Sequence, residues 1–145
     1  TTRGEFILQL IRTLDLHAEA EDNFADIPAD APYAGAVAVA KKLGITNGVG
    51  GGRFDPEAPI TRQDMMTLIV RALQVARIDL SLGTSKDLDR FIDKGDVADY
   101  AVQSVATLVK HGIVQGDGLR LNPTSLTTNA ETAVLMYRLY RLAHG

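Results

Sequence analysis

Two arginines, Arg3 and Arg62, stand where a positive charge needs an explanation. Each follows a threonine, at the point where a polar stretch gives way to an apolar pattern of helical spacing. The first turn of a helix favours negative charge, so a cation there is mildly unfavourable. A bound anion would reverse that balance, because the guanidinium fork and the free backbone N–H groups both bind carboxylate or phosphate. The two positions therefore predict local anion sites.

The threonines beside these arginines predict where the helices begin. A threonine followed three residues later by an acid is typical of a capping box, in which the threonine hydroxyl accepts a backbone N–H of the first turn. We interpret both members of each pair as helix caps rather than as ligand-binding residues. The pattern occurs three times, as Thr2 with Glu5, Thr61 with Asp64, and Thr128 with Glu131.

The same segments recur along the chain, which is typical of a repeat protein. "FADIPADAPYA" and "FIDKGDVADYA" align at an offset of 67 residues, and "TTRGEFILQLIRTL" aligns with "ITRQDMMTLIVRAL" at an offset of 59. We expect the back half of one repeat at 1–23, a repeat with its linker at 24–90, and a further repeat at 91–145. One such repeat is too short to bury a core alone, so the copies should pack together.

The sequence of each repeat predicts mainly helical structure. An Ala- and Val-rich helix is expected over 33–43 and again over 100–111, each ended by a glycine that suits a left-handed cap. A Gly-rich turn, a short extended piece and a second helix follow, whereas the linker "ARIDLSLGTSKDLDR" is expected to be a surface loop. The second helix carries an apolar stripe predicted to be buried: Phe6, Leu10, Ile11, Leu14, Met65, Ile69, Val70, Leu73, Met136, Tyr137 and Tyr140.

Composition excludes several classes of function. The net charge of −3 gives no general basic field, so nucleic acid is not expected as a partner. The absence of cysteine removes disulfides, thiolate metal sites and cysteine nucleophiles. No apolar stretch reaches the roughly 18 residues of a membrane span. The chain begins at Thr1 without an initiator methionine or a signal-like segment, and we interpret it as a processed or excised fragment.

The order of these motifs resembles the S-layer homology domain over nearly the whole chain. The resemblance is carried by Phe-x-Asp, aromatic-Ala, Gly-Ile-x-x-Gly, Phe-x-Pro, Ile-Thr-Arg-x-acid and Arg-Ala-Leu. It implies a mainly α fold, in which tandem helix-loop-helix repeats with short extended segments form a pseudo-threefold bundle. It also implies a non-catalytic, extracellular module of the bacterial surface that binds pyruvylated secondary cell-wall polysaccharide in grooves between repeats.

Carried onto this sequence, the resemblance implies two charged grooves and one doubtful groove. The first would combine Arg3, Asp26, Tyr33, Gly48, Gly50 and Gly51. The second would combine Arg62, Asp93, Tyr100, Gly116 and Gly118. In the third, Asn129 stands where arginine is expected and brings no charge. A peptidoglycan-associated glycan is a further candidate ligand, and the missing half of the first repeat could be supplied by another chain.

The same residues allow other interpretations. On physics alone, Arg3 and Arg62 could instead form ion pairs with a neighbouring repeat, for instance with Asp26 or Asp93. The run of glycines at 48–52 lacks the Lys-Ser/Thr ending of a phosphate loop, and the three histidines lack metal-ligand spacing, so neither cofactor nor metal is expected. Repetition of one element favours binding over catalysis. The main alternative is a protein-interaction or self-assembly module of a surface-layer protein.

Overall fold

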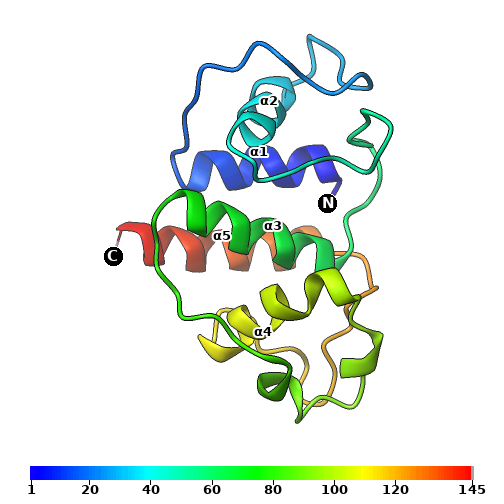
Figure 1. Cartoon of the computed structure of the whole chain (residues 1–145), viewed down its shortest axis with the longest axis vertical. Helices are drawn as coiled ribbons and strands as arrows, with labels where there is room; N and C mark the ends of the chain where they lie inside the picture. Colours follow the sequence, from blue (N-terminus) through cyan, green and yellow to red (C-terminus); the bar gives the residue numbers. More distant parts are fainter. Residues whose placement is uncertain (145) are drawn as a thin grey trace.

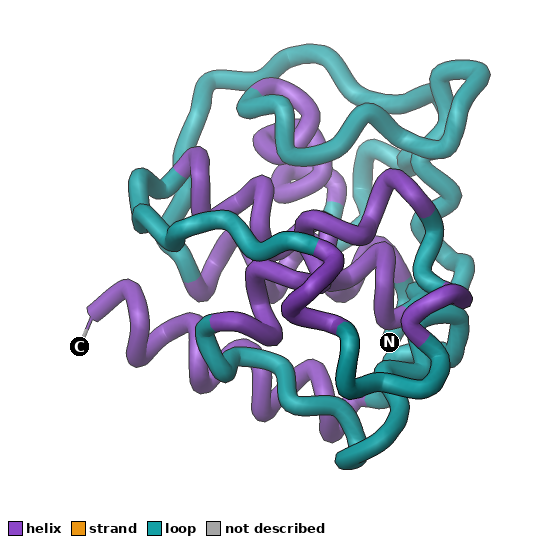
Figure 2. Tube along the Cα trace, turned by 60° about the horizontal axis from the view of Figure 1, so that its bottom comes forward, coloured by secondary structure: helices purple, strands orange, loops and turns teal. Residues whose placement is uncertain are grey.

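The computed structural model describes residues 1–144, so Gly145, the last residue of the predicted repeat 91–145, lies outside the described residues. Five α-helices form the fold: α1 (Arg3–Thr13), α2 (Ala34–Lys42), α3 (Arg62–Val75), α4 (Val102–Lys110) and α5 (Asn129–His144). Short 3-10 turns occur at Ser85–Leu88, Lys94–Asp96 and Asp99–Ala101. Figure 2 shows helices joined by loops, with no strand in the described part of the chain. The predicted mainly α fold is therefore confirmed.

The three back-half helices form the centre of the molecule. α1, α3 and α5 begin on the same side and cross the middle of the view in Figure 1, and α1 packs against both others. α2 covers α1 at one end of the molecule, and α4 covers α3 at the other. Each front-half helix thus packs on the back-half helix of the preceding repeat. Because these contacts bury Phe6, Met65 and Leu108 completely, one core runs through the repeats.

A ring of backbone hydrogen bonds joins the three repeats. The N–H of Ile60 donates to the carbonyl oxygen of Thr1 at 3.1 Å, and that of Thr127 donates to Ile60 at 2.8 Å. The backbone nitrogen of Thr1 closes the ring by donating to Thr127 at 3.1 Å. The repeat offsets of 59 and 67 make these three positions equivalent, so the ring is a direct sign of pseudo-threefold symmetry.

The predicted caps are present at the starts of the central helices. The hydroxyls of Thr2, Thr61 and Thr128 accept the backbone N–H of Glu5, Asp64 and Glu131, at distances of 3.2, 3.4 and 3.1 Å. These contacts satisfy N–H groups that the helix itself leaves free. They fix the position at which each repeat turns from extended backbone into helix.

Two sequence expectations about packing are wrong. The linker 76–90 is not a simple surface loop, since its 3-10 turn packs on α4 and buries Leu88. The apolar stripe of the last repeat is only partly buried: Met136 is 8% exposed, but Tyr137 and Tyr140 are 61% and 53% exposed. The reason is that, among the described helices, neither α2 nor α4 covers α5 in the way that α2 covers α1 and α4 covers α3.

Candidate functional site

Arg3 joins two repeats instead of extending into solvent. Its Nε donates to the carbonyl oxygen of Phe54 at 2.9 Å, and its guanidinium lies 4.8 Å from the centre of the Phe54 ring. Its Nη1 lies 3.7 Å from Oδ2 of Asp64, and the residue is only 9% exposed. Arg3 is therefore a structural bridge whose charge already faces a carboxylate.

Arg62 repeats this arrangement one repeat later. Its Nε donates to the carbonyl oxygen of Leu121 at 2.9 Å, and its Nη1 pairs with Oε2 of Glu131. Burial lowers the pKa of Arg62, while the charges of Asp117 and Asp93 oppose that shift. The ion-pair alternative thus applies to both arginines, but their partners are the helix-capping acids of the next repeat and not Asp26 or Asp93.

Asp26 and Asp93 accept hydrogen bonds from loop backbone. The carboxylate of Asp26 accepts the N–H groups of Phe54 and Asp55, both at 2.8 Å, and neither aspartate lines the grooves described below. Burial alone would raise the pKa of Asp26, but these backbone donors and the charge of Arg53 lower it. Asp93 accepts from Leu121 and Asn122 at 2.8 and 2.9 Å. Both carboxylates hold loop backbone in place, and their role in ligand binding stays a prediction.

Two equivalent grooves lie at the junctions between repeats. The first groove has a volume of about 370 Å³ and is lined by, among others, Arg3, Gly48, Asp64, Thr67, Arg71 and Tyr100. The second groove, of about 320 Å³, is lined by, among others, Arg62, Gly116, Glu131, Val134 and Arg138. The offsets of 59, 67 and 68 relate these sets position by position, apart from Tyr100. The structure therefore brings Arg3 together with Gly48, and Arg62 with Gly116, as expected.

The tyrosines are not distributed as the repeat pairing predicts. Tyr100 lies in the first groove beside Arg3, not in the second beside Arg62, and its hydroxyl donates to Asp64. Tyr33 is 8% exposed, lines neither groove and donates to Glu57 at 2.6 Å. Because α4 packs on α3 of the preceding repeat, Tyr100 reaches the groove of Arg3 instead of the groove of Arg62.

A glycine explains why the two tyrosines differ in burial. The ring of Tyr33 lies on Gly4, where an added Cβ would be 2.8 Å from the ring. The equivalent position on α3 is Gln63, whose Oε1 accepts the N–H of Ala98 at 2.8 Å. The larger side chain keeps Tyr100 away from the helix, so this ring is 59% exposed.

Among the predicted glycines, Gly48 and Gly116 are the ones that line the grooves. Both have positive φ, and a Cβ on Gly48 would lie 2.3 Å from the carbonyl oxygen of Arg53. Gly50, Gly51 and Gly118 also have positive φ but shape the turns outside the grooves. Each groove is therefore lined by the backbone of one of the predicted glycines.

Asn129 lies at the third junction. Its Oδ1 accepts the hydroxyl of Thr1 at 2.7 Å, which links the last repeat to the first. The side chain thus contributes a hydrogen bond and no charge at this position.

Sequence reasoning missed Arg71 and Arg138. These residues line the first and second grooves, and each donates from Nη1 to a loop carbonyl, of Ile45 at 3.4 Å and of Ile113 at 2.8 Å. The signal was present, because the offsets of 59 and 67 align Arg12, Arg71 and Arg138. Each groove therefore contains two arginines and one acid.

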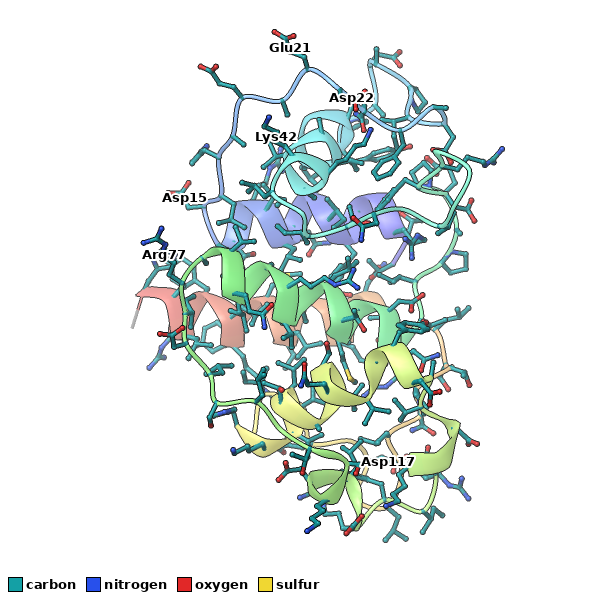
Figure 3. All side chains as sticks on the ribbon, in the orientation of Figure 1. Asp15, Glu21, Asp22, Lys42, Arg77 and Asp117 are labelled. Atoms are coloured by element: carbon teal, nitrogen blue, oxygen red, sulfur yellow. The ribbon has the colours of Figure 1, made fainter. Side chains whose placement is uncertain are left out.

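The rest of the described surface offers few alternatives. Charged residues such as Glu21, Asp22 and Lys42 lie at the α2 end of the molecule, and Asp117 lies at the opposite end (Figure 3). No group of three or more His, Asp or Glu side chains within residues 1–144 is arranged to hold a metal ion. No helix in that range has the length and apolar character needed to cross a membrane.

Comparison with known proteins identifies the family. Residues 23–66 and 90–133, more than half of the chain, match the S-layer homology domain. The chain is 30% identical to a surface-layer 125 kDa protein of Lysinibacillus sphaericus over 94% of its length, which is 11% of that protein. It is also similar to the exoglucanase XynX of Acetivibrio thermocellus, at 30% identity over 95% of the chain and 13% of the enzyme. An amylopullulanase of Thermoanaerobacterium thermosulfurigenes is 31% identical over 95% of the chain and 7% of the enzyme.

The names of these relatives describe different proteins, although all three contain a segment similar to this chain. The chain spans only about a tenth of the length of these three proteins, so the activities that name the two enzymes belong to other parts of those chains. A segment common to a surface-layer protein and to different enzymes fits a separate attachment module. The chain belongs to the S-layer homology domain family, whose members are non-catalytic modules that anchor bacterial surface proteins to the cell wall.

Proposed function

We propose that the first groove binds an acidic sugar of a pyruvylated secondary cell-wall polysaccharide, outside the cell. The observation that carries the proposal is the meeting of Arg3, Arg71 and Tyr100 in one groove. Guanidinium groups bind carboxylates, such as that of a pyruvate ketal, in two-point geometry. The exposed ring of Tyr100 offers an apolar surface and a hydroxyl to a sugar. A volume of about 370 Å³ lies within the range of small-ligand sites.

The second groove should bind the same sugar more weakly. It has Arg62 and Arg138 but no aromatic residue among its lining side chains. Val114 and Val134 stand where the first groove has Thr46 and Thr67, so two hydroxyl groups are replaced by methyl groups. The second groove therefore offers charge with fewer partners for sugar hydroxyls.

The test is co-sedimentation of the chain with purified cell-wall sacculi. Three preparations are compared: intact sacculi, sacculi stripped of the secondary polymer, and sacculi whose polymer lacks the pyruvate ketal. Binding only to the first preparation supports the proposal. Binding that survives stripping would point to a peptidoglycan-associated glycan, and the absence of binding to all three would reject a wall-anchoring role for this chain alone.

The uncovered face of α5 favours a second role, in protein binding. Val134, Tyr137 and Tyr140 are 49%, 61% and 53% exposed, whereas the equivalent Thr67, Val70 and Leu73 on α3 are at most 6% exposed under α4. We propose that this face receives a helix of the same kind as α2 and α4, from the front half of a first repeat. Such a helix would complete the threefold arrangement that the backbone ring begins.

Chemical modification of tyrosine tests this second proposal. In the chain as it stands, Tyr137 and Tyr140 should react readily with a nitrating reagent. A fusion that places a copy of residues 23–58 before Thr1 should protect both residues if the added helix docks on α5. Equal nitration of the two proteins would contradict the proposal, and protection of the unfused chain at high concentration would show that a second copy covers this face instead.

A further inference from the structure

In each groove one arginine, Arg3 or Arg62, already has partners within the protein. Arg3 donates its Nε to Phe54 and faces Asp64 with Nη1, while Arg62 uses the same atoms for Leu121 and Glu131. Each of these charges therefore already faces a carboxylate before a ligand arrives. An incoming carboxylate would also meet the acid that accompanies each arginine.

Arg71 is the other arginine of the first groove, and its charge is not matched by an acid. Within residues 1–144 no carboxylate lies within ion-pair distance of its guanidinium. Its hydrogen bond from Nη1 to the carbonyl oxygen of Ile45, at 3.4 Å, is long and uses one of its five N–H groups. The contact orients the side chain along the glycine loop and leaves other donors available.

Arg138 occupies the same position in the second groove. Its Nη1 donates to the carbonyl oxygen of Ile113 at 2.8 Å, and among the described residues it likewise has no acidic partner. The two grooves are formed by different parts of the chain. Both nevertheless combine one arginine that faces an acid with one arginine that has no acidic partner among the described residues. The arrangement is therefore a property of the repeat and not of a single side chain.

We infer that Arg71 in the first groove, and Arg138 in the second, form the direct ion pair with the acidic group of the ligand. The inference rests on the proposed function and deepens it by assigning the roles of the two arginines. Arg3 and Arg62 hold the repeats together and shape the floor of each groove. Arg71 selects for a carboxylate, while the exposed ring of Tyr100 is left to pack against the sugar.

The test compares Arg71→Gln with Arg71→Lys and with a matched control. Glutamine keeps most of the length and polarity of arginine but removes the charge, whereas lysine keeps the charge without the fork. The control is Arg12→Gln, because Arg12 is the copy of Arg71 in the first repeat and lines neither groove. Circular dichroism and thermal unfolding verify that all three variants are folded.

The ligands are two soluble forms of the wall polymer, with and without the pyruvate ketal, titrated calorimetrically. We expect Arg71→Gln to weaken binding of the ketal-bearing polymer by roughly 10- to 100-fold, the range for a hydrogen-bonded charge. It should leave binding of the ketal-free polymer unchanged, so that discrimination between the two is lost. Arg71→Lys should retain part of the preference, and Arg12→Gln all of it.

Three other outcomes would contradict the inference. If the unaltered chain prefers the ketal-bearing polymer and Arg71→Gln keeps that preference, the assignment to Arg71 is wrong while the proposed function stands. If the unaltered chain binds neither polymer, the proposed function is wrong, and the assignment of Arg71 is wrong as well. If Arg71→Gln weakened the binding of both polymers to the same degree, the inference would also be overturned. Arg71 would then shape the groove without recognising the acidic group.

Discussion

The Nε of Arg3 lies 2.9 Å from the carbonyl oxygen of Phe54 and donates a hydrogen bond to it. The equivalent bond, from Arg62 to Leu121, has the same length one repeat later. An arginine in the first turn of a helix is thus tolerated because it reaches across to the extended segment of the next repeat. The bond and its accompanying acid offset the unfavourable interaction with the helix dipole.

Replacing Arg3 with alanine should therefore reduce stability as well as binding. The substitution removes a buried charged donor from Phe54 and leaves Asp64 without its ion-pair partner, so the expected loss is about 2 to 3 kcal/mol. Arg12→Ala, on the exposed side of the same helix, should change stability by less than about 0.5 kcal/mol. Urea unfolding of both variants measures the difference. Equal stabilities would show that the bridge contributes nothing to the packing of the repeats.

The fold could be predicted from the sequence to a large extent. The repeat offsets, the capping threonines and the helix-ending Gly44 and Gly112 located the helices to within about two residues. These features are local, and local interactions determine where a helix begins and ends.

The composition of the grooves could not be predicted in the same way. Aligning Tyr33 with Tyr100 gives their equivalence within the repeat but not the junction at which each ring lies. That junction depends on which preceding helix the front half covers, which is a property of tertiary packing. The partners of Asp26 were missed for a related reason, since backbone N–H groups 28 and 29 residues away leave no pattern in side-chain chemistry.

Gly48 should tolerate substitution less well than Gly51. Both glycines have positive φ, at 79° and 63°. A Cβ on Gly48 would lie 2.3 Å from the carbonyl oxygen of Arg53 and 2.7 Å from the Phe24 ring, whereas a Cβ on Gly51 meets nothing within 4 Å. Gly51→Ala should therefore lose only about 1 kcal/mol, the penalty of a left-handed conformation. Gly48→Ala should lose several kcal/mol in urea unfolding, and similar values for both would mean that backbone conformation alone decides.

Alkaline pH should destabilise the chain partly through Tyr33 and Tyr100. The hydrogen bond to the Glu57 carboxylate, together with burial, raises the pKa of Tyr33 to about 12. Burial and the hydrogen bond to Asp64 raise the pKa of Tyr100 to about 12 as well. A raised pKa means that folding favours the protonated phenol, so this stabilisation is complete below the unfolded value of about 10 and is lost as pH rises through about 12.

The measurement is the free energy of unfolding between pH 9 and pH 12, for the unaltered chain and for Tyr33→Phe combined with Tyr100→Phe. The double variant should lose less stability over this range, because its phenylalanines do not ionise. Water screens the exposed Tyr100, so Tyr33→Phe alone should account for most of the difference. Parallel pH profiles of the two proteins would show that neither carboxylate raises the pKa of its tyrosine partner.

Gly4 and Gly35 offer a direct test of why the two tyrosines differ. Each is the second residue of its helix, α1 or α2, where alanine is normally preferred over glycine by about 0.5 to 1 kcal/mol. A Cβ on Gly35 meets nothing within 4 Å, so Gly35→Ala should stabilise the chain by that amount. A Cβ on Gly4 would lie 2.8 to 3.0 Å from three ring atoms of Tyr33, and the ring cannot yield without leaving the helix. Gly4→Ala should therefore destabilise the chain and expose Tyr33 to nitration, as Gln63 keeps Tyr100 exposed. If Gly4→Ala instead gained stability with Tyr33 still protected, the burial of Tyr33 would have to depend on its bond to Glu57 and not on the missing side chain beneath it.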